Sequence, residues 1–216
     1  MPKKTLKNDP KHRGPDPKKT RDKILKAAKT LFVKQGFAGT AMREIAVKAK
    51  VTQSLLHHHF GTKESLWQMV KYELTNRYFE AIAEQIEAEQ HGKNPASIKD
   101  TLEFRFRFMQ NNPELIRMSL WQYLDKYKHH STTKGRDLLK HLIENLTEDQ
   151  KNNKLRNDID PTIITAIMFI LTTGWFQQNY DWILKQGKLS SLNEKEAADT
   201  YLEAIQKILI KGLAPD

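Results

Sequence analysis

Three consecutive histidines, His57, His58 and His59, are the residues whose type first suggests chemistry. Neighbouring residues on a helix point about 100° apart, so three imidazoles in a row cannot close around one metal ion. Asp125 and His129 stand four residues apart and could share a metal, but such pairs are usually solvated neighbours. The sequence therefore predicts no metal site and no cofactor.

Catalytic patterns are missing as well. The chain has no cysteine, which excludes a thiol nucleophile, disulfides and Cys-ligated zinc or iron–sulfur sites. Gly-rich phosphate loops and the G-x-S-x-G and HExxH patterns are also absent. An enzyme would have to use dispersed carboxylates, so we expect a protein that is not an enzyme.

Charge is distributed unevenly along the 216 residues. The chain has 36 Lys and Arg against 26 Asp and Glu, a net charge of +10. Residues 1–60 hold 15 of the basic and four of the acidic residues, so the rest of the chain is close to neutral. A polyanion-binding module joined to a neutral module has this distribution. The two parts are therefore expected to have different partners.

The spacing of apolar residues predicts helices in the basic part. Residues 1–17 carry Pro and Lys with almost no large apolar residue, which predicts a flexible basic arm. Beyond the arm, one apolar stripe runs to a helix end at Gly36. Thr40 and Thr52 are suited to cap the two short helices that follow, which residues 49–51 separate. This spacing is typical of a helix-turn-helix.

Helices are also predicted for the rest of the chain. Thr62 can cap a long helix of about 25 residues, which residues 91–95 would end. Further helix boundaries are indicated by the patterns Asn112-Pro113, Asp160-Pro161, Asn193-x-x-Glu196 and Gly212.

One short segment permits two interpretations. Three Phe alternate with two Arg over residues 104–108, as in a half-buried strand or a platform for single-stranded nucleic acid. Ile98, Leu102, Phe106 and Met109 nevertheless keep helical spacing, and a lone strand would have no partner. We predict a helix here and an all-α chain.

No export or membrane segment is indicated. The basic N-terminus is not followed by the apolar run of a signal peptide. Residues 161–180 are the longest uncharged stretch, but they include four Thr and three side-chain amides, whereas a span needs about 20 predominantly apolar residues. We expect a cytoplasmic protein without a membrane partner.

Residues 21–66 resemble the DNA-binding domain of the TetR family of one-component transcriptional regulators. The matching residues extend without a gap over this segment: Ile24, Leu25, Ala27, Ala28, Leu31, Phe32, Gly36, Thr40, Ile45, Ala46, Ala49, Val51, Thr52, Leu56, Phe60, Lys63, Glu64 and Leu66. The sequence departs from the family pattern at Lys50, where Gly is usual, and at His57, where an aromatic residue, most often Tyr, is usual.

The resemblance implies roles for exposed residues of this segment. Gln53 and Ser54 would read base edges in the major groove, with Arg43 of the preceding helix as a third reader. The positions that in the family contact phosphates or lie against the DNA backbone correspond to Thr40, Thr52, His57, His58 and Lys63. Basic residues of the arm would add phosphate or minor-groove contacts.

For the remainder of the chain, the resemblance implies an apolar ligand pocket and a dimer interface formed by the last two helices. Because aromatic residues are frequent there, we place the pocket at Phe106, Trp121, Tyr123, Trp175 and Phe176. The apolar faces of the last helices place the interface at Ile167, Leu171, Ile208 and Leu209.

The sequence thus predicts an all-α chain with three parts. These are a flexible basic arm (1–17), a three-helix helix-turn-helix DNA-binding domain (18–63) and a larger helical ligand-binding and dimerisation domain (64–216). The expected function is that of a homodimeric repressor that a small apolar or aromatic ligand releases from a palindromic operator in double-stranded DNA. The alternative is a ligand-independent architectural or recruiting factor whose C-terminal domain binds protein.

Overall fold

The computed structural model describes residues 16–90, 97–124, 133–177 and 185–215, and these residues form helices and turns without a strand. The all-α prediction is confirmed, including a helix where the three Phe alternate with Arg. The chain divides into two compact units, Met1–Val70 and Lys71–Asp216. The predicted arm and residues 91–95 lie outside the described residues, apart from the last two positions of the arm.

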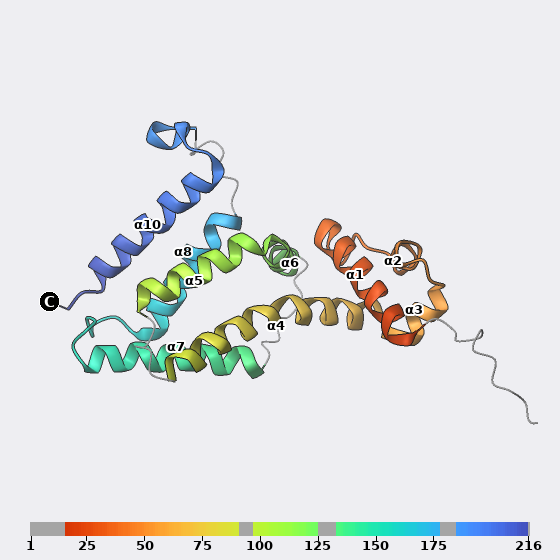
Figure 1. Cartoon of the computed structure of the whole chain (residues 1–216), viewed down its shortest axis with the longest axis horizontal. Coiled ribbons are helices and arrows are strands. Elements are labelled where there is room, and N and C mark those ends of the chain that lie inside the picture. The colour runs from red at the N-terminus through yellow and green to blue at the C-terminus, as the bar shows by residue number, and fades with distance from the viewer. Residues whose placement is uncertain (1–15, 91–96, 125–132, 178–184, 216) are drawn as a thin grey trace, which may run out of the picture. The chain divides into compact units, whose positions relative to one another are not determined.

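The first unit is built from three helices and the beginning of a fourth (Figure 1). Its helices are α1 (Pro17–Gln35), α2 (Met42–Ala49), α3 (Gln53–Phe60) and the first turns of α4 (Lys63–Gln90). The apolar stripes predicted for these helices meet in one core, in which Ile24, Phe32, Leu56 and Trp67 are fully buried. Phe32 and Trp67 pack edge to face with ring centroids 5.0 Å apart.

Helix ends in the first unit follow the predicted capping residues with one exception. Gly36 ends α1 with a φ of 73°, and Thr52 caps α3 by accepting a hydrogen bond from the Leu55 N–H at 3.2 Å. The prediction that Thr40 caps α2 is wrong, because the N-cap residue is Ala41. Glu44 replaces a capping hydroxyl there: its carboxylate accepts a hydrogen bond from the Ala41 N–H at 3.1 Å.

The second unit contains the rest of α4 and a group of helices packed around α5 and α8 (Figure 1). Its further elements are α5 (Ile98–Asn111), α6 (Pro113–Leu124), α7 (Thr133–Lys151), α8 (Pro161–Gln177), the short 3-10 helix η2 (Gly187–Ser191) and α10 (Glu194–Gly212). Helices α5 and α10 pack against each other and on α8, and α7 also packs on α8. One core cluster joins Leu102, Leu146, Met168 and Leu209.

Capping residues predicted in the second unit are largely confirmed. Asp160 accepts a hydrogen bond from the Thr162 N–H at 2.7 Å at the start of α8, and this hydrogen bonding lowers the pKa of the Asp160 carboxyl. Asn193 and Glu196 form the expected capping box of α10. The Asn112 side chain instead donates to the Phe108 carbonyl at the end of α5.

Two further findings concern helix ends and membrane spans. Gly212 does not close α10 as predicted, because it lies in the last turn and Leu213 is the C-cap residue. Among the described helices, none combines the length and the apolar character that crossing a bilayer requires.

Candidate DNA-binding surface and ligand cavity

The turn between α2 and α3 positions the surface that the sequence predicts for DNA binding. Lys50 ends α2 in the left-handed conformation, with φ 57° and ψ 46°. The Val51 N–H then donates to the Ala46 carbonyl at 3.0 Å and ties the turn to α2. Leu56 and Phe60 fix α3 because both side chains are buried in the core of the first unit. The opposite side of α3 is therefore left exposed.

The three predicted base readers are all solvent-exposed. Gln53 and Ser54 occupy the first turn of α3, and Arg43 lies in the first turn of α2. Thr52 is exposed as well; because its oxygen acts as the cap acceptor, its hydroxyl hydrogen is free to donate to a phosphate oxygen. Base reading by Gln53, Ser54 and Arg43 stays a prediction, as does phosphate binding by Thr52.

Thr40 and Lys63 have internal partners in place of the exposure that phosphate binding would need. The Thr40 side chain is 1 % exposed and donates to the Gly36 carbonyl at 2.7 Å. The Lys63 ammonium donates to the carbonyls of Phe37 and Thr40, both at 3.0 Å, and lies over the Phe37 ring. These contacts tie the start of α4 to the segment between α1 and α2. We therefore propose that both residues hold the unit together instead of binding phosphate.

The three histidines of α3 have different surroundings. His57 is exposed, and its Nδ1 lies 2.7 Å from the Gly61 carbonyl oxygen. Since a carbonyl oxygen can only accept, Nδ1 is the donor in this contact. His58 is exposed, whereas His59 is half-buried beside Phe60. No group of three potential metal-ligating side chains occurs in the part of the chain that the structure describes.

Replacing Lys50 by Gly is expected to stabilise the protein by about 0.5–1 kcal/mol. A side chain at a left-handed position costs about 1–2 kcal/mol, and part of the gain is offset by the greater freedom of Gly in the unfolded chain. Urea unfolding measures the difference. Lys50→Ala is the control, because it removes the same charge and keeps the Cβ atom. Equal stabilities of the Gly and Ala variants would contradict the prediction.

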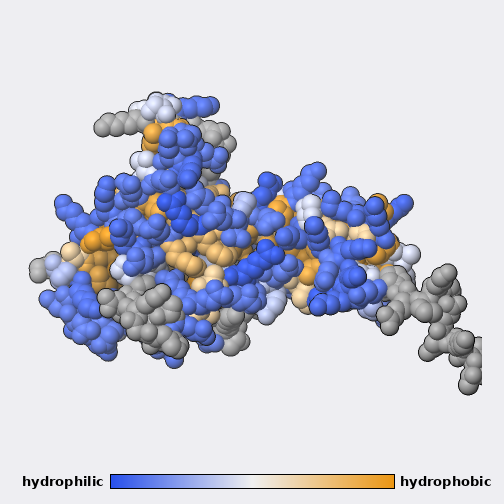
Figure 2. Space-filling model, in the orientation of Figure 1, coloured by the Kyte–Doolittle hydropathy of each residue, from blue (hydrophilic) through white to orange (hydrophobic). Residues whose placement is uncertain are grey.

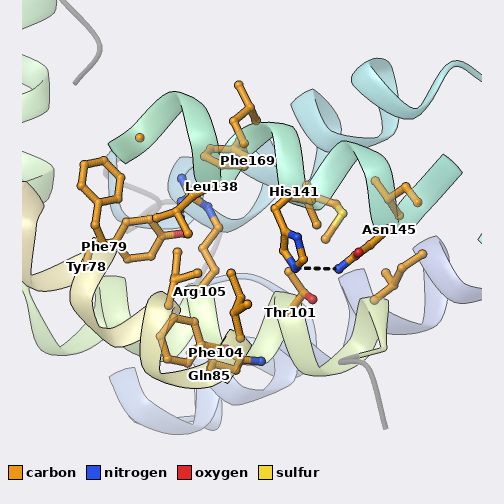
Figure 3. A pocket seen from close by; sticks show the side chains of 18 of the residues that line it. Tyr78, Phe79, Gln85, Thr101, Phe104, Arg105, Leu138, His141, Asn145 and Phe169 are labelled. Carbon is orange, nitrogen blue, oxygen red and sulfur yellow. Dashed lines mark hydrogen bonds between the residues drawn. The ribbon is translucent and has the colours of Figure 1, made fainter. Parts of the chain in front are cut away.

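A cavity of about 320 Å³ lies within the second unit. Side chains of α4, α5, α7 and α8 line it, among them Phe79, Ile82, Phe104, Leu138, Leu142 and Phe169. Figure 3 shows Tyr78 and Phe79 toward one end and His141 and Asn145 toward the other. Its size and mainly apolar wall are typical of small-molecule sites, which range over about 300–1,000 Å³.

The residues predicted to line a pocket do not line this cavity. Phe106 is fully buried and packs against Phe176, with ring centroids 4.8 Å apart, while Trp175 stacks on Tyr201 of α10. These aromatic residues fill a core where α5, α8 and α10 meet. Trp121 and Tyr123 lie on α6, and Tyr123 is 77 % exposed. The cavity therefore lies at a different place from the predicted pocket.

Arg105 of α5 is a cavity residue that the prediction missed. It is buried, and its guanidinium donates to the hydroxyls of Thr172, Tyr78 and Thr173 at 2.8, 2.8 and 2.9 Å. A sequence signal was available, because Leu102, Arg105 and Met109 are spaced three and four apart. That spacing places the arginine on the inward stripe of α5.

The predicted dimer residues divide into two groups. Ile208 is 67 % exposed and Ile167 is also exposed, whereas Leu209 is 8 % exposed and belongs to the core. Leu171 is half-buried and packs against both core clusters of the second unit. We therefore propose Ile167 and Ile208, and not Leu209 or Leu171, as interface residues. Other exposed isoleucines of these helices are Ile163 and Ile170 of α8 and Ile210 of α10.

The exposed isoleucines of α8 and α10 are large apolar side chains on a mostly hydrophilic surface. Figure 2 shows hydrophilic side chains over most of the visible face, interrupted by hydrophobic patches. On α8, Ile163, Ile167 and Ile170 are spaced four and three residues apart, so they share one face of the helix. Apolar faces of this kind mark contact surfaces.

These features define the class of helix-turn-helix regulators. The first unit has three helices, and its exposed α3 follows a tight turn. It is joined to a larger helical unit that has its own cavity. Comparisons with known proteins agree with this class. The family described as "Bacterial regulatory proteins, tetR family" matches residues 24–70. The family described as "Tetracyclin repressor-like, C-terminal domain" matches residues 104–206. The chain belongs to the TetR family of DNA-binding transcriptional regulators, which are not enzymes.

Individual relatives extend over nearly the whole chain. The HTH-type transcriptional repressor NicS of Pseudomonas putida is 25 % identical over 209 residues, covering 90 % of this chain and 92 % of the relative. The crystal structure of the transcriptional regulator SCO4942 from Streptomyces coelicolor superimposes with a TM-score of 0.68 at 19 % identity, covering 88 % of this chain and 97 % of that one. A gamma-butyrolactone receptor superimposes with a TM-score of 0.62 at 21 % identity, covering 92 % and 90 %.

Proposed function

We propose that this protein is a homodimeric repressor that a small, mainly apolar molecule releases from a palindromic operator. The observation that carries the proposal is the cavity in the second unit, because its lining includes α4, the helix whose first turns belong to the DNA-binding unit. The name of the relative NicS, a transcriptional repressor, supports the direction of control. The gamma-butyrolactone receptor provides a precedent for ligand binding on this fold.

The DNA-binding half of the proposal rests on α3 and the first turn of α2. Gln53 can form a bidentate pair with adenine, Ser54 can serve either base type, and Arg43 can reach guanine or phosphate. All three side chains are exposed and stand on helices with buried opposite faces, so the scaffold holds them rigidly. Thr52, His57 and His58 would hold the flanking phosphates.

Release requires the ligand to distinguish two states of the protein. The ligand must bind more tightly to the state that cannot span both half-sites. To shift the ratio of this state to the DNA-binding state from 1:99 to 99:1, the ligand must prefer it by about 5.5 kcal/mol of binding free energy. Helix α4 contributes Tyr78, Phe79 and Ile82 to the cavity wall, so a ligand that displaces this wall acts on α4 directly. The same helix carries Leu66 and Trp67 in the core of the DNA-binding unit. We assign α4 as the element that couples the two sites.

Dimerisation supplies the two-fold symmetry that a palindromic site demands. Two recognition helices must lie about one helical turn of DNA apart, or a multiple of it, which one protomer cannot provide. The exposed isoleucines of α8 and α10 are the apolar surface that we assign to the partner. This surface belongs to the last two long helices of the chain.

The proposal is tested with DNA from the intergenic region beside the gene, because regulators of this kind often act on their neighbours. Footprinting is expected to show two protected half-sites about one helical turn or a multiple apart. A small-molecule screen is then read by Trp fluorescence and by loss of the protected region. Good operator binding with no releasing molecule would favour the ligand-independent factor instead.

A further inference from the structure

The guanidinium of Arg105 is a buried charge whose partners among the described residues are all neutral. The residue is 7 % exposed, and no carboxylate among the described residues lies within ion-pair distance of it. Its three side-chain acceptors are the hydroxyls of Thr172, Thr173 and Tyr78. An arginine stays protonated in a protein, and buried charges are ordinarily paired with an opposite charge.

The hydrogen bonds of Arg105 leave part of its donor capacity unused. A guanidinium has five N–H groups, and three donate here, one each from Nε, Nη1 and Nη2. One N–H therefore remains on each terminal nitrogen. A carboxylate that approaches a guanidinium end-on accepts one hydrogen bond from each terminal nitrogen.

The surroundings of Arg105 hold the group in place at the cavity. The Phe169 ring lies under the guanidinium, with Cζ 3.7 Å from the ring centroid, and the Tyr78 ring lies 5.4 Å away. Both rings also line the cavity, as Figure 3 shows. The guanidinium is thus fixed by three hydroxyls and an aromatic face before any ligand arrives, so little side-chain freedom is lost on binding.

The acidic side chain and the imidazole of the cavity wall already have partners. Asp149 forms an ion pair with Lys154, and His141 is hydrogen-bonded to Asn145 on the same helix. Asp149 therefore has its own counter-ion, whereas Arg105 has none among the described residues. The cavity as a whole has an unbalanced positive charge in a mainly apolar wall.

We propose that the ligand is a monocarboxylic acid with an apolar body, whose carboxylate is bound by Arg105. This inference rests on the proposed function and adds the charge of the ligand to it. The carboxylate supplies the missing counter-ion and accepts the two free N–H groups, while the aromatic or aliphatic body fills the space beside Phe79, Ile82, Phe104 and Leu138. An aryl-alkanoic acid and a medium-chain fatty acid share this chemistry.

The test compares each acid with its neutral amide on the full-length protein. The probes are 3-phenylpropionate against 3-phenylpropanamide, and decanoate against decanamide, titrated by calorimetry and by release of operator DNA. Hydrogen bonds to a charged group contribute about 1.5–3 kcal/mol, so the acid is expected to bind about 10- to 150-fold more tightly than its amide. The acid that binds more tightly shows whether the apolar body of the ligand is aromatic or aliphatic.

Variants of Arg105 assign the effect to this residue. Arg105→Met keeps an unbranched stem that matches Arg105 as far as Nε and removes the buried charge, so no unpaired charge is left in the interior. It should lose the preference for the acid and leave amide affinity within threefold. Arg105→Lys keeps the charge but lacks the planar guanidinium, so its preference for the acid should lie between those of the wild type and Arg105→Met. Arg107→Met is the matched control, since Arg107 of the same helix pairs with Asp199 and does not line the cavity.

Three results would overturn the inference. Amides that bind as tightly as acids, or an Arg105→Met variant that keeps the acid preference, would exclude a role for the charge and leave the repressor proposal intact. Binding by neither class up to the solubility limit, with no release of operator DNA, would contradict the inference, whereas the small-molecule screen decides the proposed function. Should Arg105→Met not fold, the comparison of acid and amide on the wild type still decides the question.

Discussion

Replacing Ile208 by Glu is expected to yield a folded monomer that binds operator DNA at least about 100-fold more weakly than the wild type, a loss of about 2.7 kcal/mol or more. Ile208 is 67 % exposed, so a carboxylate at this position stays in water in the isolated protomer. In the proposed dimer the same carboxylate would be buried against an apolar partner surface, which costs several kcal/mol per ion. Since the interface is two-fold, each substitution acts twice.

Leu209→Glu is the matched comparison, one residue along the same helix. Leu209 packs with Leu102 and Met168 in the core of the second unit, so a carboxylate there lacks any partner and should unfold that unit. Circular dichroism and sedimentation distinguish the outcomes: helical but monomeric for Ile208→Glu, and loss of helix for Leu209→Glu. An Ile208→Glu protein that remains dimeric at micromolar concentration would show that the partner binds elsewhere.

Replacing Gln53 by Ala is expected to weaken binding to the cognate operator by about 1–3 kcal/mol, or about 5- to 150-fold, with little change on random DNA. The side chain is exposed at the start of α3 and has no role in the core, so its loss should not affect the free energy of unfolding. Competition binding against operators mutated at each position measures both effects. The expected signature is a relaxed preference at one base pair of each half-site.

Unlike Gln53→Ala, Lys63→Met is expected to lower the stability of the protein and to leave its contacts with DNA unchanged. Its ammonium donates to two backbone carbonyls, and losing a partner of a buried polar group costs about 1–3 kcal/mol, so the stability of the first unit should fall. The salt dependence of DNA binding should stay unchanged, because no phosphate contact is removed. Lys48→Met removes an exposed lysine of α2 as a control. A flatter salt dependence for Lys63→Met would restore the phosphate contact that the sequence predicted.

Local signals were sufficient to predict the helices and most of their boundaries. Capping by Thr52, Asp160 and Asn193 depends on residues within one turn, and the apolar spacing of each helix depends on that helix alone. Thr40 shows where such reasoning ends. Its hydroxyl donates to the Gly36 carbonyl, and Glu44 caps the start of α2 instead. Both residues are suited to cap this helix, and their spacing in the sequence does not show which of them does so.

The errors in the second unit have a different cause. Leu209 and Ile208 both continue the apolar stripe of α10, and only the positions of α5 and α8 decide which of them is covered. The predicted pocket followed the density of aromatic residues, but Phe106 and Phe176 fill the space between helices instead of enclosing it. A cavity depends on where side chains fail to meet, which is a property of tertiary packing.

The central claim is that a molecule in the cavity of the second unit controls DNA binding by the first, and blocking the cavity tests it most directly. Leu138→Trp adds an indole to the cavity wall on α7. Asp137→Trp adds the same group at an exposed neighbouring position outside the lining. Anisotropy of labelled operator is measured while the releasing ligand is titrated. We predict that both variants bind the operator as the wild type does, and that only Leu138→Trp resists release. Release of Leu138→Trp at the wild-type ligand concentration would contradict the account.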